Sequence, residues 1–481
     1  MSAQNDCLAK AFQLIIKFYS KNNTKQNNNK NIMLLRLVCR TFNVFVNDFV
    51  LNDISTLNIS CSFDPICWET LRKRIRMMPN LTCLNLMLFD YSRGYYGFYN
   101  DYGDYEDYYF QETVPNLALF FQSILSDLQG LKLTSLGIRY DSNEKVNASL
   151  LAPSLAELTK LISLTSLSLE TPLADQLVPS LANLTNLTSL KFEFNNIETP
   201  NTPFSASLLE KMIPSLAQTL CSLPNLTDLN LGRNRLEDSH IRLLVPSLER
   251  LIDLTSINFE ANHITDAGLE LLAPVIIKMP ELTSVNFRSN KISFYHSELF
   301  LSNLNKLTKL TDLNLGYNHI NEYGFYVLMP ILIKLTNLTF FGLDGFYVHV
   351  SSDIRSNILE HNFDKLTNLK NLSLASNNIK VFGPSLAKLT NLMNLNLSNN
   401  RLGSDEMSLL APSLIMMTSM TSLNLEWNEL RCLAGAQSLI PILRGMKHLK
   451  FFKIDGYELG TEGKALLVDI FRNMPELKYE F

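Results

Sequence analysis

The chain has 481 residues, and its 42 lysine and arginine residues are nearly balanced by 46 aspartate and glutamate residues, which gives a formal net charge of −4. Because nucleic-acid binding requires a strongly basic surface, this balance argues against nucleic acid as a partner. The sequence contains no run of about 18 apolar residues, so it predicts no membrane-spanning helix and no membrane partner.

The cysteines and the N-terminus both favour an intracellular location. The seven cysteines are scattered and odd in number, which does not fit a disulfide framework. The apolar run at the N-terminus is interrupted by Lys10, Gln13 and Lys17 and has no small-residue cleavage site after it, so it does not resemble a secretory signal. We therefore expect a cytoplasmic location, with the nucleus as the alternative.

Residues 1–50 differ from the rest of the chain. Residues 9–19 and 32–49 carry apolar residues at helical spacing, and a polar, asparagine-rich loop separates them, so we expect two or three short helices. The sequence Leu-Val-Cys-Arg-Thr-Phe at 37–42 resembles the second half of an F-box, and residues 14–19 resemble its first half. This resemblance implies binding to the adaptor of a cullin-type ubiquitin ligase through Ile15, Phe18, Tyr19, Leu35, Leu37, Val38 and Phe42.

A helical cap is the alternative interpretation of residues 1–50, because a solenoid needs a polar-faced end to shield its first repeat. Further along the chain, residues 89–114 are rich in tyrosine, acidic residues and glycine and show no apolar period. We expect an exposed, mobile insertion there. It is either a docking segment for a partner or a tolerated low-complexity expansion of a loop.

Residues 51–481 are built from a repeated sequence that is most regular between Leu226 and Leu338. Each unit begins with alternating apolar and polar residues, which predicts a short strand, and an asparagine follows the strand. The amide side chain of this asparagine can both donate and accept, so we expect a ladder of asparagines that pairs buried backbone groups. The regular units start 28 residues apart, at Leu226, Leu254, Leu282, Leu310 and Leu338.

Segments with apolar residues at helical spacing connect the strands, and each of seven such segments carries a proline at the same place. Because proline fits best in the first turn of a helix, we expect each helix to begin near its proline or to be kinked there. The prolines are Pro153, Pro179, Pro214, Pro246, Pro274, Pro330 and Pro412.

The pattern L-x-x-L-x-L-x-x-N-x-L at this period resembles the leucine-rich repeat of the ribonuclease-inhibitor-like class. The resemblance implies an α/β horseshoe of about 14–15 repeats, with parallel strands on the concave side and helices on the convex side. Together with the F-box resemblance, it implies an F-box protein with leucine-rich repeats. We expect residues 1–50 to form a separate helical element and residues 51–481 to form one solenoid.

Motifs for catalysis are missing from the sequence. It contains no phosphate-binding loop, no dinucleotide fingerprint, no HExxH and no CxxC pair, so we predict no catalytic site, no metal and no cofactor, and we do not expect an enzyme. His240, His263 and His319 follow repeat strands, and we interpret them as solvated turn residues.

Side chains that face outwards from the strands are mostly serine, asparagine or aspartate, so the larger and charged exceptions are candidate contacts for a protein partner. Arginine and aromatic residues are the usual anchors of protein interfaces, and Arg288, Tyr317 and Phe340 lie in three consecutive units. The candidate partner-binding residues are Glu260, Arg288, Tyr317, Phe340, Asp344 and Trp427.

The sequence therefore predicts a substrate-recognition subunit of a cullin-type (SCF) ubiquitin ligase, which holds a protein target on its concave face and is a monomer outside its complex. One alternative is an intracellular scaffold with no link to a ligase. Another is a GTPase-activating protein, in which Arg233 or Arg235 would stabilise a transferring phosphate.

Overall fold

A computed structural model describes residues 32–34, 56–62, 72, 75–76, 78, 80–89, 123–141, 156–170, 174–193, 206–345, 365–377 and 384–480. The chain divides into two compact units, residues 1–226 and residues 227–481, and each is described by itself. All seven candidate adaptor-binding residues, residues 90–114 of the expected insertion and Pro153 lie outside the described residues. The assignment of residues 51–481 to one solenoid stays a prediction.

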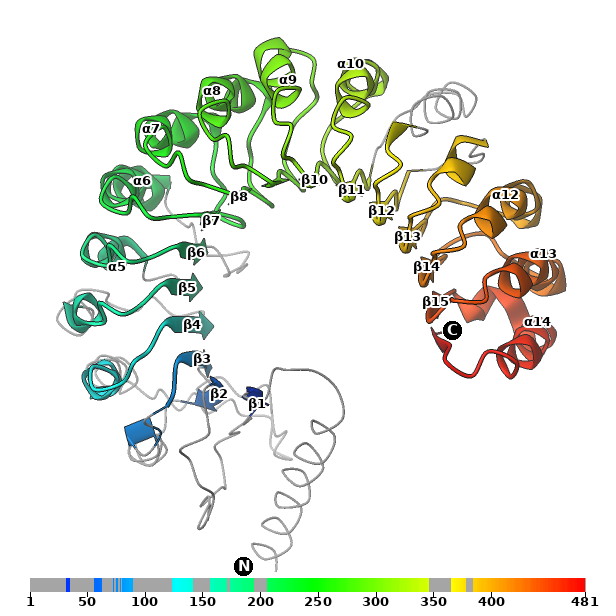
Figure 1. The fold of residues 1–481 in the computed structure, drawn as a ribbon, viewed down its shortest axis with the longest axis horizontal. Coiled ribbons are helices and arrows are strands. Elements are labelled where there is room, and N and C mark those ends of the chain that lie inside the picture. The colour runs from blue at the N-terminus through cyan, green and yellow to red at the C-terminus, as the bar shows by residue number, and fades with distance from the viewer. Residues whose placement is uncertain are drawn as a thin grey trace, which may run out of the picture. The chain divides into compact units, whose positions relative to one another are not determined.

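The unit of residues 1–226 contains parallel strands that pair in sequence order, each with the next (Figure 1). The strands are β1 (Ile32–Leu34), β2 (Thr56–Ser62), β3 (Cys83–Phe89), β4 (Ser135–Asp141), β5 (Ser166–Glu170) and β6 (Ser189–Glu193). The helices with described bounds are the 3-10 helix η3 (Ala156–Lys160), α5 (Ala174–Leu181) and α6 (Ala206–Leu220), and residues 123–128 are also helical.

Strand β1 corrects one expectation. Residues 32–49 were predicted to be helical, yet Ile32, Met33 and Leu34 form a strand that pairs in parallel with Thr56, Leu57 and Asn58. The helical spacing of apolar residues does not decide the conformation here, because the edge of β2 offers unpaired backbone groups to a neighbouring segment.

The unit of residues 227–481 repeats the same arrangement, with strands on the inner side of an arc and helices on its outer side (Figure 1). Each strand pairs in parallel with the next. The strands are β7 (Asp228–Asn230), β8 (Ser256–Asn258), β9 (Ser284–Asn286), β10 (Asp312–Asn314), β11 (Phe340–Gly342), β12 (Asn371–Ser373), β13 (Asn394–Asn396), β14 (Ser422–Asn424), β15 (Phe451–Lys453) and β16 (Lys478–Glu480). The helices are α7 (Asp238–Leu248), α8 (Asp266–Ile276), α9 (Glu298–Leu304), α10 (Glu322–Leu332), the 3-10 helix η5 (Pro384–Lys388), α12 (Ser404–Met416), α13 (Cys432–Gly445) and α14 (Gly456–Phe471).

Stacked apolar side chains between the strands and the helices form the core of this second unit. Leu254, Ile257 and Phe259 of one repeat are all buried. The Phe259 ring stacks on Phe287 of the next repeat at 5.7 Å, and Phe287 meets the edge of Phe300 at 5.8 Å. Burying each such side chain stabilises the fold by about 2 kcal/mol. The predicted α/β repeat fold is confirmed.

The predicted asparagine ladder is also present. The Asn290 side-chain oxygen accepts from the backbone nitrogen of Ile264 at 3.0 Å, and its nitrogen donates to the carbonyl oxygens of Phe259 at 2.9 Å and Phe287 at 3.0 Å. Asn262 and Asn318 make equivalent bonds one repeat earlier and one repeat later. Each asparagine therefore ties its own turn to the turn of the preceding repeat.

The helices do not begin near their prolines. Helix α8 begins at Asp266, after Thr265 caps it by accepting from the backbone nitrogen of Ala267 at 3.2 Å, and Pro274 lies near its C-terminal end. Capping residues fix the start because they satisfy the free N–H groups of the first turn. The expectation that a helix begins near its proline is therefore wrong at Pro274, and also at Pro179, Pro214, Pro246, Pro330 and Pro412, which all lie inside helices. The alternative, a kink at the proline, stays a prediction.

Two of the three histidines differ from solvated turn residues. His240 is buried in the first turn of α7, where its Nδ1 accepts from the backbone nitrogen of Glu237 at 2.9 Å. His263 is partly buried, and burial together with the charge of Lys291 lowers its pKa. Only His319 is exposed as expected. The difference arises because these turns lead directly into the cap of the next helix.

Candidate functional site

Four of the six candidate partner-binding residues come together on the strand side of the second unit. The Arg288 guanidinium forms an ion pair with Asp344, and its Nε lies 3.9 Å from a carboxylate oxygen of Glu260. Its Cζ lies 4.3 Å from the centre of the Tyr317 ring, which is the geometry of a cation–π contact. We refer to Glu260, Arg288, Tyr317 and Asp344 as the concave cluster.

Two glycines make the concave cluster possible. Glu260, Arg288, Gly316 and Asp344 occupy the same position in successive repeats, so Arg288 must reach across Gly316 to meet Asp344. A Cβ on Gly316 would lie 3.2 Å from Nη1 of Arg288 and 3.0 Å from the backbone nitrogen of Asp344. Even an alanine at this position would therefore crowd the ion pair.

The second glycine, Gly345, lies under the ring of Tyr317. A Cβ there would lie only 2.6 Å from Cδ1 of Tyr317, and the φ angle of +66° is one that other residues rarely adopt. Neither glycine belongs to the partner-binding residues predicted from the sequence. An alignment of the repeats could have found Gly316, since it stands between an arginine and an aspartate in one column of the sheet.

Neighbouring repeats hold the cluster in place. Asp344 is only 5% exposed, and it accepts hydrogen bonds from the Ser373 hydroxyl at 2.5 Å and from the backbone nitrogen of Ala375 at 2.9 Å. Glu260 accepts from the side-chain amide of Asn286 at 3.2 Å. Because these bonds fix the side chains before any partner arrives, binding loses less side-chain entropy.

Phe340 and Trp427 lie apart from the cluster. Phe340 is partly buried on β11, where it pairs with Asp312 and Asn371 of the adjacent strands. Trp427 follows β14 and is 72% exposed. Its φ is +58°, in the left-handed region. A non-glycine residue costs about 1 kcal/mol in this conformation. An exposed tryptophan on a strained backbone is a candidate second anchor.

The left-handed conformation recurs just before the ladder asparagines, at residues whose types do not predict it. The tight turn after each short strand requires it. Arg233 lies at this position and is exposed, whereas Arg235 is also left-handed but partly buried. The non-glycine residues that share the position are Arg233, Ala261, Ser289, Tyr317, Ser376, Asn399 and Trp427.

The described part of the chain has neither a metal-binding group of side chains nor a membrane-spanning helix. Its histidines, cysteines and acidic residues form no group of three or more that could hold a metal ion. None of its helices is both long enough and apolar enough to cross a membrane.

Comparisons with known proteins identify the repeat. A family model described as leucine-rich repeat matches residues 251–273 and 306–322. The chain is similar in fold to an internalin from Listeria monocytogenes str. 4b F2365, with 21% identity over 74% of this chain and 77% of that chain and a TM-score of 0.38. It is also similar to a leucine-rich-repeat protein of Leptospira interrogans, with 15% identity over 89% of this chain and 90% of that chain and a TM-score of 0.41. No curated protein sequence matches the chain.

Proposed function

We propose that this chain of leucine-rich repeats, which are protein–protein interaction modules, binds a protein partner on the strand side of residues 227–481. The observation that carries the proposal is the concave cluster, in which an arginine, a tyrosine and two carboxylates from four repeats are in contact. Arginine and tyrosine dominate the binding energy of protein interfaces, and a rigid arrangement increases their contribution. Trp427 is the proposed second anchor.

Charge reversal in the cluster tests this proposal. Replacing Arg288 with glutamate places three carboxylates together and removes the cation–π contact, so recovery of the partner by affinity purification should fall by about tenfold or more. The matched control is Lys278→Glu, because Lys278 is also ion-paired, to Glu249 at 2.9 Å, but lies just after helix α8 on the helix side of the unit. If both variants recover the same amount of partner, the partner binds a surface other than the concave cluster.

We further propose that residues 1–50 bind the adaptor of a cullin-type ubiquitin ligase, which would make the chain a substrate-recognition subunit. The F-box resemblance of residues 37–42 supports this, and it rests on sequence because these residues lie outside the described ones. The full chain should retain the adaptor in a pull-down, and Val38→Asp should reduce the retained amount by about tenfold, since it puts a charge into an apolar contact. A scaffold without a ligase link would retain no adaptor in either form.

A further inference from the structure

The loops that lead from helices into strands follow a common pattern in the second unit. Three of them carry Thr-Asn between two leucines, and the asparagine donates to the carbonyl of the threonine in the preceding loop. Asn337 donates to Thr308 at 2.7 Å, and Asn391 donates to Thr367 at 2.9 Å. In these three loops the asparagine side chain therefore links each repeat to the preceding one by a hydrogen bond.

The loop before β15 departs from this pattern. It carries Lys447 and His448 where those three loops carry Thr-Asn, and Lys450 follows where threonine is usual. Arg444 lies beside them in the last turn of α13. All four side chains are exposed, and within the described residues none of them forms an ion pair with a carboxylate. Since the chain as a whole is slightly acidic, four basic residues without a carboxylate partner stand out within this repeat.

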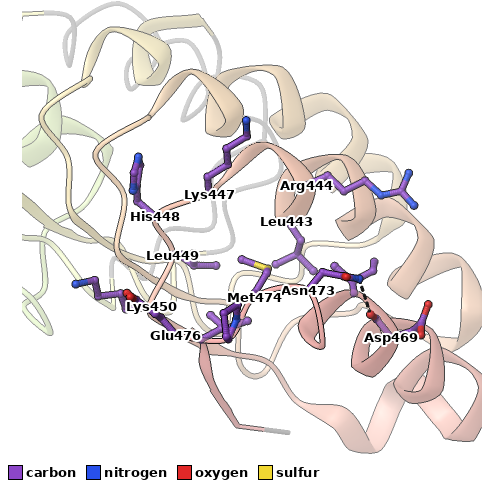
Figure 2. Close-up of a pocket in the computed structure, with 13 residues that line it drawn as sticks. Leu443, Arg444, Lys447, His448, Leu449, Lys450, Asp469, Asn473, Met474 and Glu476 are labelled. Carbon is purple, nitrogen blue, oxygen red and sulfur yellow. Dashed lines mark hydrogen bonds between the residues drawn. The ribbon is translucent and has the colours of Figure 1, made fainter.

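These basic residues border a pocket of about 550 Å³ between the two last repeats (Figure 2). Lys447 and His448 come from the loop before β15, and Asp469 and Asn473 come from α14 and the turn after it, on the opposite side. The partly buried Ile470, Met474 and Leu477 provide apolar surface inside the pocket.

Acidic residues in the pocket do not cancel its basic character. Asp469 is already paired with Arg472, whose guanidinium lies 3.4 Å from it. The other carboxylate that lines the pocket belongs to Glu476. Glu476 occupies the position in the loop of the last repeat that His448 occupies in the loop before β15. Four basic and two acidic residues thus line the pocket, and one of the acidic residues has its own partner.

We propose that this basic groove, formed by Arg444, Lys447, His448 and Lys450 with the apolar Ile470, Met474 and Leu477, binds an acidic peptide segment of a partner protein. Carboxylates of the segment pair with the lysines and the arginine, and an apolar residue between them contacts the partly buried side chains. Charge complementarity and apolar contact together select a peptide over a free anion. The groove is separate from the concave cluster, so it gives the chain a second contact.

Fluorescence anisotropy with the full chain tests the proposal. The probe is a short labelled peptide in which glutamate alternates with leucine, and the reference probe carries glutamine in place of glutamate. The double variant Lys447→Thr, His448→Asn restores the Thr-Asn loop of other repeats, so the fold should be retained. It should weaken binding of the acidic probe by about tenfold, because it removes charge-assisted hydrogen bonds. Added salt should weaken binding by the unaltered chain as well.

A matched control removes a basic residue from the same position of another loop. Lys309→Asn also restores a Thr-Asn loop, and it should leave binding of the acidic probe unchanged. Three results would overturn the proposal. The double variant could bind as tightly as the unaltered chain, the glutamine probe could bind as tightly as the glutamate probe, or an oligothymidylate could bind as tightly as the peptide, which would make the groove a general polyanion site.

Discussion

Replacing Asn290 with alanine is expected to lower the free energy of unfolding by about 3–5 kcal/mol. Asn290 is only 5% exposed, and its amide bonds to backbone groups of Ile264, Phe259 and Phe287 and, at a longer 3.3 Å, to the carbonyl of Arg288. Alanine leaves the N–H of Ile264 buried without its partner, which costs about 1–3 kcal/mol. It also removes one of the two side-chain bonds that the Phe259 and Phe287 carbonyls each accept, since Asn262 and Asn318 stay bound to them, and each lost bond costs about 1 kcal/mol. The measurement is the urea midpoint of the full chain, followed by circular dichroism.

The control is an exposed asparagine that makes a similar bond, because it shows how much of the lost stability is due to burial. Asn337 also bonds to the preceding repeat, at 2.7 Å to Thr308, but it is exposed, so water can replace its bond. Asn337→Ala should cost less than about 1 kcal/mol. If the two alanine variants unfold at the same urea concentration, the buried ladder does not stabilise the unit in the way proposed.

Replacing Asp266 with alanine is expected to cost a similar amount, about 3–5 kcal/mol. Asp266 is 8% exposed, and its carboxylate accepts five hydrogen bonds from the segment between β9 and α9. Four come from the backbone nitrogens of Ser293 at 2.8 Å, Phe294 at 3.0 Å, Tyr295 at 2.7 Å and His296 at 3.1 Å, and one comes from the Ser293 hydroxyl at 2.6 Å. The exposed Asp253→Ala should change the urea midpoint very little.

The contribution of Asp266 should also depend on pH. Burial alone would raise its pKa, but the hydrogen bonds from Ser293, His296 and Phe294 outweigh burial and hold the pKa below 3.8. A carboxylate whose pKa is lower in the folded than in the unfolded chain stabilises the fold above the unfolded pKa. The difference in stability between the unaltered chain and Asp266→Asn should therefore be constant near neutral pH and shrink as the pH falls below 3.8. A difference that stays constant through acid titration would contradict this assignment.

Strands and ladder asparagines could be predicted from the sequence because each depends on a few adjacent residues. The alternation in Leu254–Phe259 fixes which side chains are buried, and Asn262 follows at the one place where an amide is needed. The contact between Arg288 and Asp344 could not be predicted in this way. It depends on the alignment of three repeats and on the absence of a side chain at Gly316, which no single repeat reveals.

Helix boundaries were less predictable, since two local signals compete. Pro274 suggested the start of a helix, but Thr265 caps the helix earlier and the proline is accommodated near its end. The prediction that His240 is solvated was wrong for a related reason. The turn that contains His240 is also the first turn of α7, so its side chain is buried. In both places the packing of neighbouring repeats decides the structure.

The asparagine ladder has a consequence for synthesis of the protein. The Asn290 amide completes the turn of the repeat that begins at Leu254, although the ribosome adds Asn290 only after that whole repeat has been made. The same order holds for Asn318 and the repeat before it. Nascent chains fold from the N-terminus as they emerge. In the regular block the N–H that follows each turn therefore lacks its amide partner until the chain has grown by a further 26 residues.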